Sequence, residues 1–450
     1  MKKRLATLLM ALAVMTQAWA QNKPFELATE AVRNMRIGWN LGNTLDSNSG
    51  DTLNMWIERW TDRSPNSYET AWGQPTTKPE LLQMMKEAGF NAIRVPVTWY
   101  PHMEAEFKFE GNSTVWNPSK DDIGTKIQAA WMKRVHEVVD YVIGQGMYCI
   151  LNVHHDTGAS NTAWLVADMD DYARQHERFE AVWRQIAEEF KDYGDHLLFE
   201  GYNEMLDVKR SWCFASFNAN GQYNAAIATS AYNAINAYAQ SFVDAVRSTG
   251  GNNAERNLIV CTYGACNGSG TWNSHLQDPL KMMKLPSDAA QGHLLFEVHC
   301  YPDVSNLTNA KNEVRSVFGY LKTHLVSKGA PVIIGEWGTA SGNDYDNRRS
   351  NLLAFSRYFV EQAKQNDIAT FHWMGLSDGA SRSVPEFNQP DLLDAIVKGY
   401  YGEEGYQNGI IAPQSTQSAD AAIYSLDGRK LQSCRPGIYI KGGKKVATKK

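Results

Sequence analysis

Short apolar runs alternate with longer amphipathic stretches from residue 35 to about residue 400. Eight runs have the length and the β-branched and aromatic content of buried strands: 35–42, 91–97, 148–154, 196–203, 257–264, 294–301, 331–337 and 369–375. Helical periodicity follows them at 78–89, 125–145, 172–193, 223–249, 277–284, 310–328, 348–366 and 390–400. Eight strand–helix pairs predict an α/β fold, the (β/α)8 TIM barrel. A doubly wound sheet has fewer units and a glycine-rich first turn, which is missing here.

The two ends of the chain differ from this pattern. Residues 1–20 combine a basic start, an apolar run from Leu5 to Met15 and the triplet Ala18-Trp19-Ala20, which is typical of a signal peptide. We expect the barrel domain over 21–405, a polar linker over 406–420 and two short strand-like runs over 421–450. A segment as short as 421–450 cannot bury a core of its own, so we expect a short β-like C-terminal appendage.

Composition and charge exclude several classes of protein. Hydrophobic residues are 43% and charged residues 21% of the chain, which is ordinary for a globular protein, and the net charge of −5 offers no basic surface for nucleic acid. The 14 tryptophans and 20 tyrosines exceed what core packing usually needs, and flat aromatic faces suit the stacking of sugar rings. We expect a monomer with no membrane span in the mature chain.

The six cysteines do not form a framework. Cys149, Cys261 and Cys300 lie inside apolar runs and are expected to be small buried hydrophobic residues. Cys213 and Cys266 lie in loop-like sequence and could pair with each other, while the sixth cysteine stands alone near the C-terminus. Because no Cys-x-x-Cys pair is present, we expect no structural metal, and nothing in the sequence calls for a cofactor.

Polar side chains gather at the predicted carboxyl ends of the strands, where a TIM barrel carries its active site. A purely structural role would scatter these residue types over helices and loops. Their clustering therefore predicts a catalytic centre, formed by Asn40, Arg94, His154, Asn203, Glu204, His299, Tyr301, Glu336 and Trp373, with His155 as a contact that could equally be structural.

Two of these residues are carboxylates that follow apolar strands. Glu204 follows the apolar residues of the fourth predicted strand and Glu336 those of the seventh, so we expect them to face each other across the barrel mouth. Burying a glutamate is costly unless it is paired or functional. Hydrolysis of a glycosidic bond needs such a pair, and carboxyl groups about 5–5.5 Å apart give retention through a covalent intermediate. The alternative is a structural salt bridge, for example with Arg94.

The neighbours of the two carboxylates favour different roles. Arg94 would keep Glu336 ionised as the nucleophile, because an opposite charge lowers a carboxyl pKa. Glu204 has no cation beside it in the sequence, which suits a proton donor. Once Glu336 becomes an ester its charge disappears, and Glu204 can then ionise and act as a base. Asn203 is expected to donate to the sugar 2-hydroxyl, and Trp373 to offer a platform for a pyranose ring.

These residues resemble glycoside hydrolase family 5, the cellulase and mannanase family, over roughly 30–400. The matching segments are NLGNTLD at 40–46, TTKPELLQMMKEAGFNAIRVPVTW at 76–99, LNVHHD at 151–156, the NE of GYNE, HCY at 299–301, GEWG at 335–338 and HW at 372–373. The resemblance implies that Glu204 is the acid/base and Glu336 the nucleophile, supported by Arg94, His154, Asn203, His299, Tyr301 and Trp373. The family usually has proline after Asn-Glu, where this chain has Met205, and this difference concerns the shape of loop 206–221.

The tail carries a second resemblance. IYSLDGRKL followed by GIYIKGGKKV resembles the C-terminal sorting domain of Bacteroidetes type IX secretion, which implies a bacterial protein that is secreted or held at the cell surface after passing through the periplasm. The alternative is a small β-hairpin that caps the barrel.

The resemblance favours a retaining endo-β-1,4-glucanase, a cellulase acting on a β-linked polysaccharide. Mixed-linkage glucan, xyloglucan and mannan are alternative substrates, since loop shape decides among them. A strip of aromatic residues at the mouth could bind a long chain: Trp39, Trp72, Trp99, Trp212 and Trp337. Two other classes compete: a metal-dependent hydrolase using His154, His155 and Asp156, and a polysaccharide-binding protein without catalysis.

Overall fold

Eight parallel strands close into a barrel in the order β1-β12-β11-β10-β9-β8-β7-β2. The computed structural model describes residues 24–105, 108–110, 113–115, 123–217, 222–339 and 345–407, and four short strands of the C-terminal tail. The barrel strands are β1 (Ile37–Asn40), β2 (Ala92–Val95), β7 (Tyr148–Asn152), β8 (Leu197–Glu200), β9 (Leu258–Cys261), β10 (Leu294–Cys300), β11 (Val332–Trp337) and β12 (Ala369–Trp373). Each falls within a predicted run, which confirms the TIM barrel.

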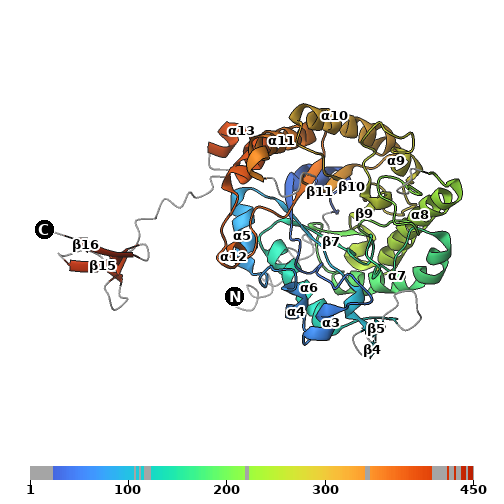
Figure 1. Cartoon of the computed structure of the whole chain (residues 1–450), viewed down its shortest axis with the longest axis horizontal. Helices are drawn as coiled ribbons and strands as arrows, with labels where there is room; N and C mark the ends of the chain where they lie inside the picture. The colour runs from blue at the N-terminus through green and yellow to red at the C-terminus, as the bar shows by residue number, and fades with distance from the viewer. Residues whose placement is uncertain are drawn as a thin grey trace, which may run out of the picture.

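A ring of helices surrounds the strands (Figure 1). Its members are α5 (Pro79–Ala88), α6 (Ala129–Gly144), α7 (Met169–Glu189), α8 (Ala225–Arg247), α9 (Asp278–Met282), α10 (Leu307–His324), α11 (Tyr345–Gln365) and α13 (Pro390–Gln407). Local sequence sets their ends. Asp168 caps α7 by accepting the backbone N–H groups of Asp170 and Asp171, and α5 begins at Pro79 and ends at Gly89, whose φ of 110° suits glycine.

The amino-terminal end of the barrel interior is apolar and is packed against α2 (Ala28–Met35). One face of α2, with Ala28, Ala31, Val32 and Met35, joins a cluster with the first inward-facing residues of the strands: Ala92, Tyr148, Ile150, Leu198, Ile259, Leu295, Ile333, Ala369 and Phe371. The sequence pattern missed α2 because eight residues give only two turns of periodicity.

Several short elements in the loops were also not predicted. They are the helices α3 (Trp56–Trp60), α4 (Pro65–Glu69) and α12 (Ala380–Ser383), the 3₁₀ turns η1 (Tyr100–His102), η2 (Gly251–Ala254), η3 (Tyr263–Ala265) and η4 (Val326–Lys328), and the strands β3 (Met103–Ala105), β4 (Lys108–Glu110), β5 (Ser113–Val115) and β6 (Ile123–Ile127). The helix expected over 125–145 is wrong at its start, because residues 123–127 pair with β3 as an antiparallel strand.

The predicted signal peptide lies outside the described residues, as does the linker beyond residue 407. The last barrel helix, α13, continues two residues past the expected boundary at 405. In the tail, β13 (Ile423–Tyr424), β14 (Lys430–Leu431), β15 (Gly437–Lys441) and β16 (Lys444–Thr448) form an antiparallel sheet of their own. Within the described parts of the chain, no helix is long and apolar enough to cross a membrane.

Candidate active site

Arg94, the third residue of β2, is fully buried at the centre of the site. Its Nη1 donates to Oε1 of Glu336 at 2.8 Å and to Oδ1 of Asn40 at 3.0 Å, and its Nη2 donates to Oδ1 of Asn203 at 2.7 Å. The Asn40 amide in turn donates to the backbone oxygens of Gly335 and Phe371. Asn40 therefore fixes Arg94 against the barrel wall instead of reaching toward a substrate.

Glu336 is held as a carboxylate by groups from several strands. Besides Arg94, the hydroxyl of Tyr301 donates to its Oε2 at 2.7 Å, and Nε2 of His154 lies 3.8 Å from Oε1. Burial alone would raise the pKa of Glu336, but the charges of His299 and Arg94 and the hydrogen bond from Tyr301 outweigh it and lower the pKa. An ionised carboxylate in this position can act as a nucleophile.

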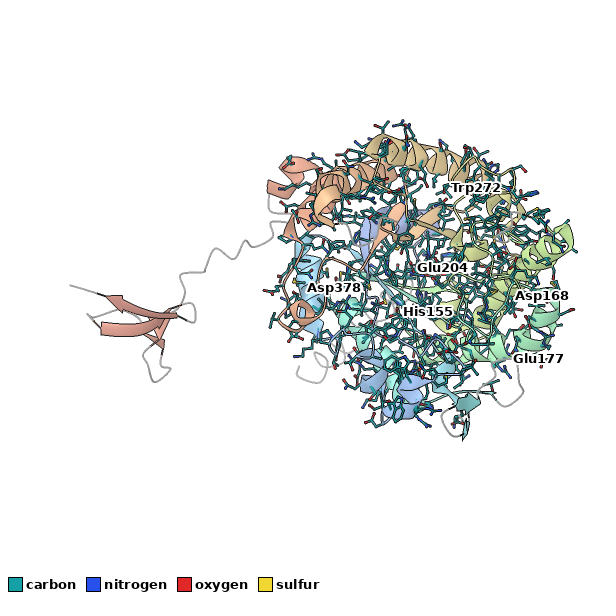
Figure 2. All side chains as sticks on the ribbon, in the orientation of Figure 1. His155, Asp168, Glu177, Glu204, Trp272 and Asp378 are labelled. Carbon is teal, nitrogen blue, oxygen red and sulfur yellow. The ribbon has the colours of Figure 1, made fainter. Side chains whose placement is uncertain are left out.

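Glu204 lies beyond the end of β8, with a quarter of its side chain exposed, near the centre of the ring of helices (Figure 2). Nδ1 of His299 is 2.8 Å from its Oε1 and 3.5 Å from Oε2 of Glu336. A carboxylate oxygen of Glu204 and one of Glu336 lie within 4.8 Å of each other. So close an approach of two oxygens is compatible with the ~5–5.5 Å between the carboxyl groups of retaining glycosidases.

Glu204 has no cation beside it in the sequence, but it has a basic neighbour in the folded chain. His299, from β10, stands between Glu204 and Glu336. Burial would lower the pKa of this imidazole, but Glu336, Glu204 and Glu297 raise it to about 10. These carboxylates therefore favour the imidazolium form of His299, and the two catalytic candidates share one basic neighbour that sequence distance had hidden.

The remaining predicted residues line the same mouth. His154 stacks in parallel with Trp373, with ring centroids 5.7 Å apart and an interplanar angle of 5°. His155 is partly exposed, 5.4 Å from the ring of Trp72, and its Nε2 lies 3.9 Å from Oδ2 of Asp46. All ten predicted site residues thus lie at one end of the barrel, with Asn40 and Arg94 deepest and His155 and Tyr301 toward solvent.

Two buried glutamates of the site were not predicted. Glu200 accepts two hydrogen bonds from Arg94, at 2.6 and 2.7 Å, and one from Asn152 at 2.8 Å. Burial raises the pKa of Glu200 to about 7 in spite of Arg94. Glu297 lies 3.4 Å from Nε of Arg94 and 3.5 Å from Nε2 of His299. Both stand inside apolar strands, and a charged residue in such a run is the signal that could have identified them.

Among the described residues, two groups of side chains lie close enough together to hold a metal ion. One is Glu204, His299 and Glu336, and the other is Asp46, His154 and His155. Asp156, offered by the sequence as a ligand, is a structural anchor, since its oxygens accept from the backbone of Trp99 and Tyr100 and from Nε1 of Trp164. The carboxylate of Asp46 is likewise bonded to backbone N–H groups of its own turn.

The aromatic strip expected at the mouth is partly wrong. Trp39, Trp99 and Trp337 are at most 1% exposed and belong to the core, because their faces pack against neighbouring side chains. Trp72 is partly exposed and Trp212 is 42% exposed, so both can meet a ligand. Trp272, exposed by 58%, was missed; Figure 2 shows it farther from the barrel centre than Glu204.

A cavity of about 250 Å³ lies beside the proton-donor candidate. It is lined by Glu204, His299, Tyr301, Trp212 and residues 264–269, among others. Cys213 and Cys266 both line it and are free thiols, so the pairing left open by the sequence is absent here.

The segment after Glu204 is fixed without the usual proline. Met205 is fully buried, and its carbonyl accepts the N–H of Gly264 at 3.0 Å. The carboxylate of Asp207 then accepts the N–H groups of Lys209 and Ser211. Residues 218–221 of the expected loop lie outside the described residues.

Comparisons with known proteins agree with this geometry. The family model "Cellulase (glycosyl hydrolase family 5)" matches residues 57–378. The chain is 32% identical over 389 residues to endoglucanase B of Neocallimastix patriciarum, covering 82% of this chain and 71% of that protein.

Two solved structures extend the comparison. A broad-specificity endoglucanase from an uncultured bacterium has 54% identity and a TM-score of 0.76, covering 85% of this chain and 98% of that one. A family 5 enzyme from Prevotella bryantii B14, solved as a mutant with a xyloglucan tetradecasaccharide, has 38% identity and a TM-score of 0.69, covering 84% and 99%. The chain belongs to glycosyl hydrolase family 5, the cellulase family.

Proposed function

We propose that Glu336 and Glu204 perform a double displacement in which Glu336 is the nucleophile and Glu204 the acid/base. The activity is that of a retaining endo-β-1,4-glucanase that hydrolyses internal bonds of cellulose-like β-glucan. The observation that supports the division of roles is the difference in surroundings. Glu336 is bonded to Arg94 and Tyr301 and is almost fully buried, whereas Glu204 is a quarter exposed and borders the open cavity.

In the first step the ionised Glu336 attacks the anomeric carbon, while Glu204 gives its proton to the departing glycosidic oxygen. Arg94 and Tyr301 hold the attacking carboxylate in place, and both oxygens of Glu336 are oriented by hydrogen bonds. Asn203, whose Oδ1 is occupied by Arg94, has its amide N–H₂ left to donate to the sugar 2-hydroxyl.

In the second step the charge of Glu336 is lost in the ester. His299 then faces the ester and Glu204, and its positive charge is no longer shared with an ionised Glu336. Glu204 can now take a proton from water, which attacks the anomeric carbon and releases a product of retained configuration.

The substrate range is proposed to include xyloglucan and mixed-linkage glucan besides unsubstituted β-1,4-glucan. The similar structures are a broad-specificity endoglucanase and an enzyme solved with a xyloglucan oligosaccharide. Trp72, near His155, and Trp212, in the cavity beside Glu204, are partly exposed and offer flat faces to sugar rings. Mannan is the alternative substrate. The rates at which reducing ends are released from glucan, xyloglucan and glucomannan under equal conditions rank the three polysaccharides as substrates.

The protein is proposed to be exported as a monomer, with residues 1–20 as the signal peptide and 421–450 as a sorting tail. The polar segment 413–420 separates the tail from the barrel in the sequence. A chain ending at residue 412 should keep its specific activity. A large loss of activity would favour the alternative, a β-structure that packs on the barrel.

A polysaccharide-binding protein without catalysis is the alternative from another class. It would bind cellohexaose and release no reducing ends from soluble β-glucan. The presence of two carboxylates with oxygens within 4.8 Å of each other favours the enzyme.

Azide rescue tests the assigned roles. In Glu204→Ala, an aryl cellobioside with a good leaving group needs no proton for the first step, and azide needs no base for the second, so added azide should restore turnover and give the β-azide. In Glu336→Ala, azide should displace the leaving group directly and give the α-azide. Opposite anomers would exchange the two roles.

A further inference from the structure

One buried carboxylate of the site has no part in the reaction as described above. Glu297 is fully buried on β10, and neither of its oxygens has a hydrogen-bond partner among the described residues. Burying a carboxylate that is compensated only by two ion pairs of 3.4 and 3.5 Å, to Arg94 and His299, is costly, so its position here calls for a role.

The nearest cations to this carboxylate are two groups of the active site. Oε1 of Glu297 lies 3.5 Å from Nε2 of His299 and 3.4 Å from Nε of Arg94. Nε2 of His299 is itself buried and without a hydrogen-bond partner among the described side chains. An unmet donor and an unmet acceptor thus face each other at a distance that a small movement converts into a charged hydrogen bond.

The backbone leaves room for this carboxylate next to the nucleophile. A Cβ atom on Gly335 would lie 1.5 Å from Oε1 of Glu297, so any larger residue before Glu336 would displace the Glu297 side chain. The register of β10 against β11 shifts between Val298 and His299, at the same level of the barrel. The missing side chain at Gly335 therefore leaves the space that the Glu297 carboxylate occupies.

We propose that Glu297 is a positioning residue that keeps the imidazole of His299 doubly protonated, with Nε2–H directed to Glu297 and Nδ1–H to Glu204. This inference rests on the proposed roles of Glu204 and Glu336. Its consequence is that the cation shared by the two catalytic glutamates persists while Glu336 is esterified, when Glu204 has to ionise. Without Glu297, His299 loses its proton at lower pH, and release of the glycosyl-enzyme slows first.

The groups that face His299 come from several strands of the barrel. The acidic ones are Glu204 beyond β8, Glu336 on β11 and Glu297 on β10 itself. The basic ones are His154 beyond β7, whose pKa is lowered by His299, and Arg94 on β2, which contacts Glu297 and Glu336. Three carboxylates favour the imidazolium and two basic groups oppose it. Replacing only Glu297 leaves the other four groups in place, so a shift in the His299 titration reports the charge of Glu297.

The test is the titration of His299 in the full-length protein, followed by ¹⁵N imidazole NMR and assigned with His299→Gln. In the unmodified protein both ring nitrogens should stay protonated through pH 8. In Glu297→Gln, which keeps the shape of the side chain, His299 should lose its proton about 1 to 3 pH units lower. Glu297→Asp should restore much of the difference, and Gly335→Ala should behave like Glu297→Gln.

The matched control is Glu200→Gln, which removes another buried carboxylate of the cluster that is bonded to Arg94 and Asn152. It should move the His299 titration less than Glu297→Gln does. With an activated aryl cellobioside, the alkaline limb of kcat should move down in Glu297→Gln, and azide should offset the loss.

An unchanged titration in Glu297→Gln, or an equal shift in Glu200→Gln, would overturn the proposal. Azide rescue with the opposite anomers would instead overturn the roles of Glu204 and Glu336 and would leave the His299 titration as it is. The two failures are therefore distinguishable.

Discussion

The two ends of the barrel interior are equally buried and opposite in chemistry. On several strands, an apolar residue at the amino-terminal end is followed two positions later by a polar one: Ala92 and Arg94, Ile150 and Asn152, Leu198 and Glu200, Leu295 and Glu297. Because residues two apart point to the same face of a strand, both members lie inside the barrel. The lower layer joins the cluster beneath α2, and the upper layer forms the site.

On a single strand, the apolar layer therefore contributes to stability and the polar layer to the chemistry of the site. Buried apolar side chains stabilise the fold by about 1.5–3 kcal/mol each, whereas each buried ion costs several kcal/mol before pairing. The charged layer is retained since Arg94 pairs with Glu200 and Glu336 and holds the nucleophile ionised. Substitutions in the two layers should therefore affect different properties.

The largest effect on activity is expected from Glu336→Ala. Removing the nucleophile should lower kcat on β-glucan by about 10⁵-fold, with the thermal midpoint nearly retained. Reducing-sugar release and a melting curve on the same preparation measure both. Activity within tenfold of the unmodified protein would mean that another carboxylate, such as Glu200, attacks.

In the apolar layer the opposite is expected: a loss of stability with activity retained. Leu295→Ala, on the strand that carries Glu297 and His299, should destabilise the protein by about 2–5 kcal/mol through lost burial and a cavity. Below the unfolding transition, kcat/KM should stay close to that of the unmodified protein. Denaturant unfolding and steady-state kinetics test this, and a large loss of kcat/KM with stability intact would show that the layers are not separate.

Much of this arrangement follows from the sequence. The eight apolar runs predict the strands, and the polar residues at their ends predict the site, because the chemistry of a TIM barrel lies at the carboxyl ends. Glu200 and Glu297 were missed since they lie inside those runs, although the two-residue spacing of Glu297, His299 and Tyr301 marks a common face.

Other features need the folded chain. Trp39 and Trp337 are adjacent in the sequence to Asn40 and Glu336, and Trp99 follows a strand end, yet all three belong to the core. His299 and Glu204 are 95 residues apart, and only the closure of the barrel brings them together. The α2 helix and β6 are too short for periodicity to reveal.

A smaller effect is expected from Tyr301→Phe, which removes the hydrogen bond to Oε2 of Glu336. That bond favours the ionised carboxylate and lowers its pKa, so its loss should raise the pKa of Glu336. Since Glu336 has to be ionised to attack, the acid limb of kcat/KM should move to higher pH. A limb that stays in place would mean that Arg94 and His299 alone fix the charge.

The smallest effect is expected at the edge of the site. Trp212→Ala removes a half-exposed indole from the cavity beside Glu204, and should raise KM for cellohexaose by about fivefold, which corresponds to ~1 kcal/mol of apolar contact. An aryl cellobioside with a small leaving group should be much less affected. Equal effects on both substrates would mean that Trp212 positions Glu204 and does not bind the polysaccharide chain.

The covalent intermediate gives the most direct test of the central claim that Glu336 attacks while Glu204 moves protons. Glu204→Ala, mixed with a 2-deoxy-2-fluoro cellobioside that carries a good leaving group, should accumulate one glycosyl adduct. Peptide mass spectrometry should locate this adduct on Glu336. An adduct on Glu200 or Glu297, or a β-glucan product released with inverted configuration by the unmodified protein, would contradict the account.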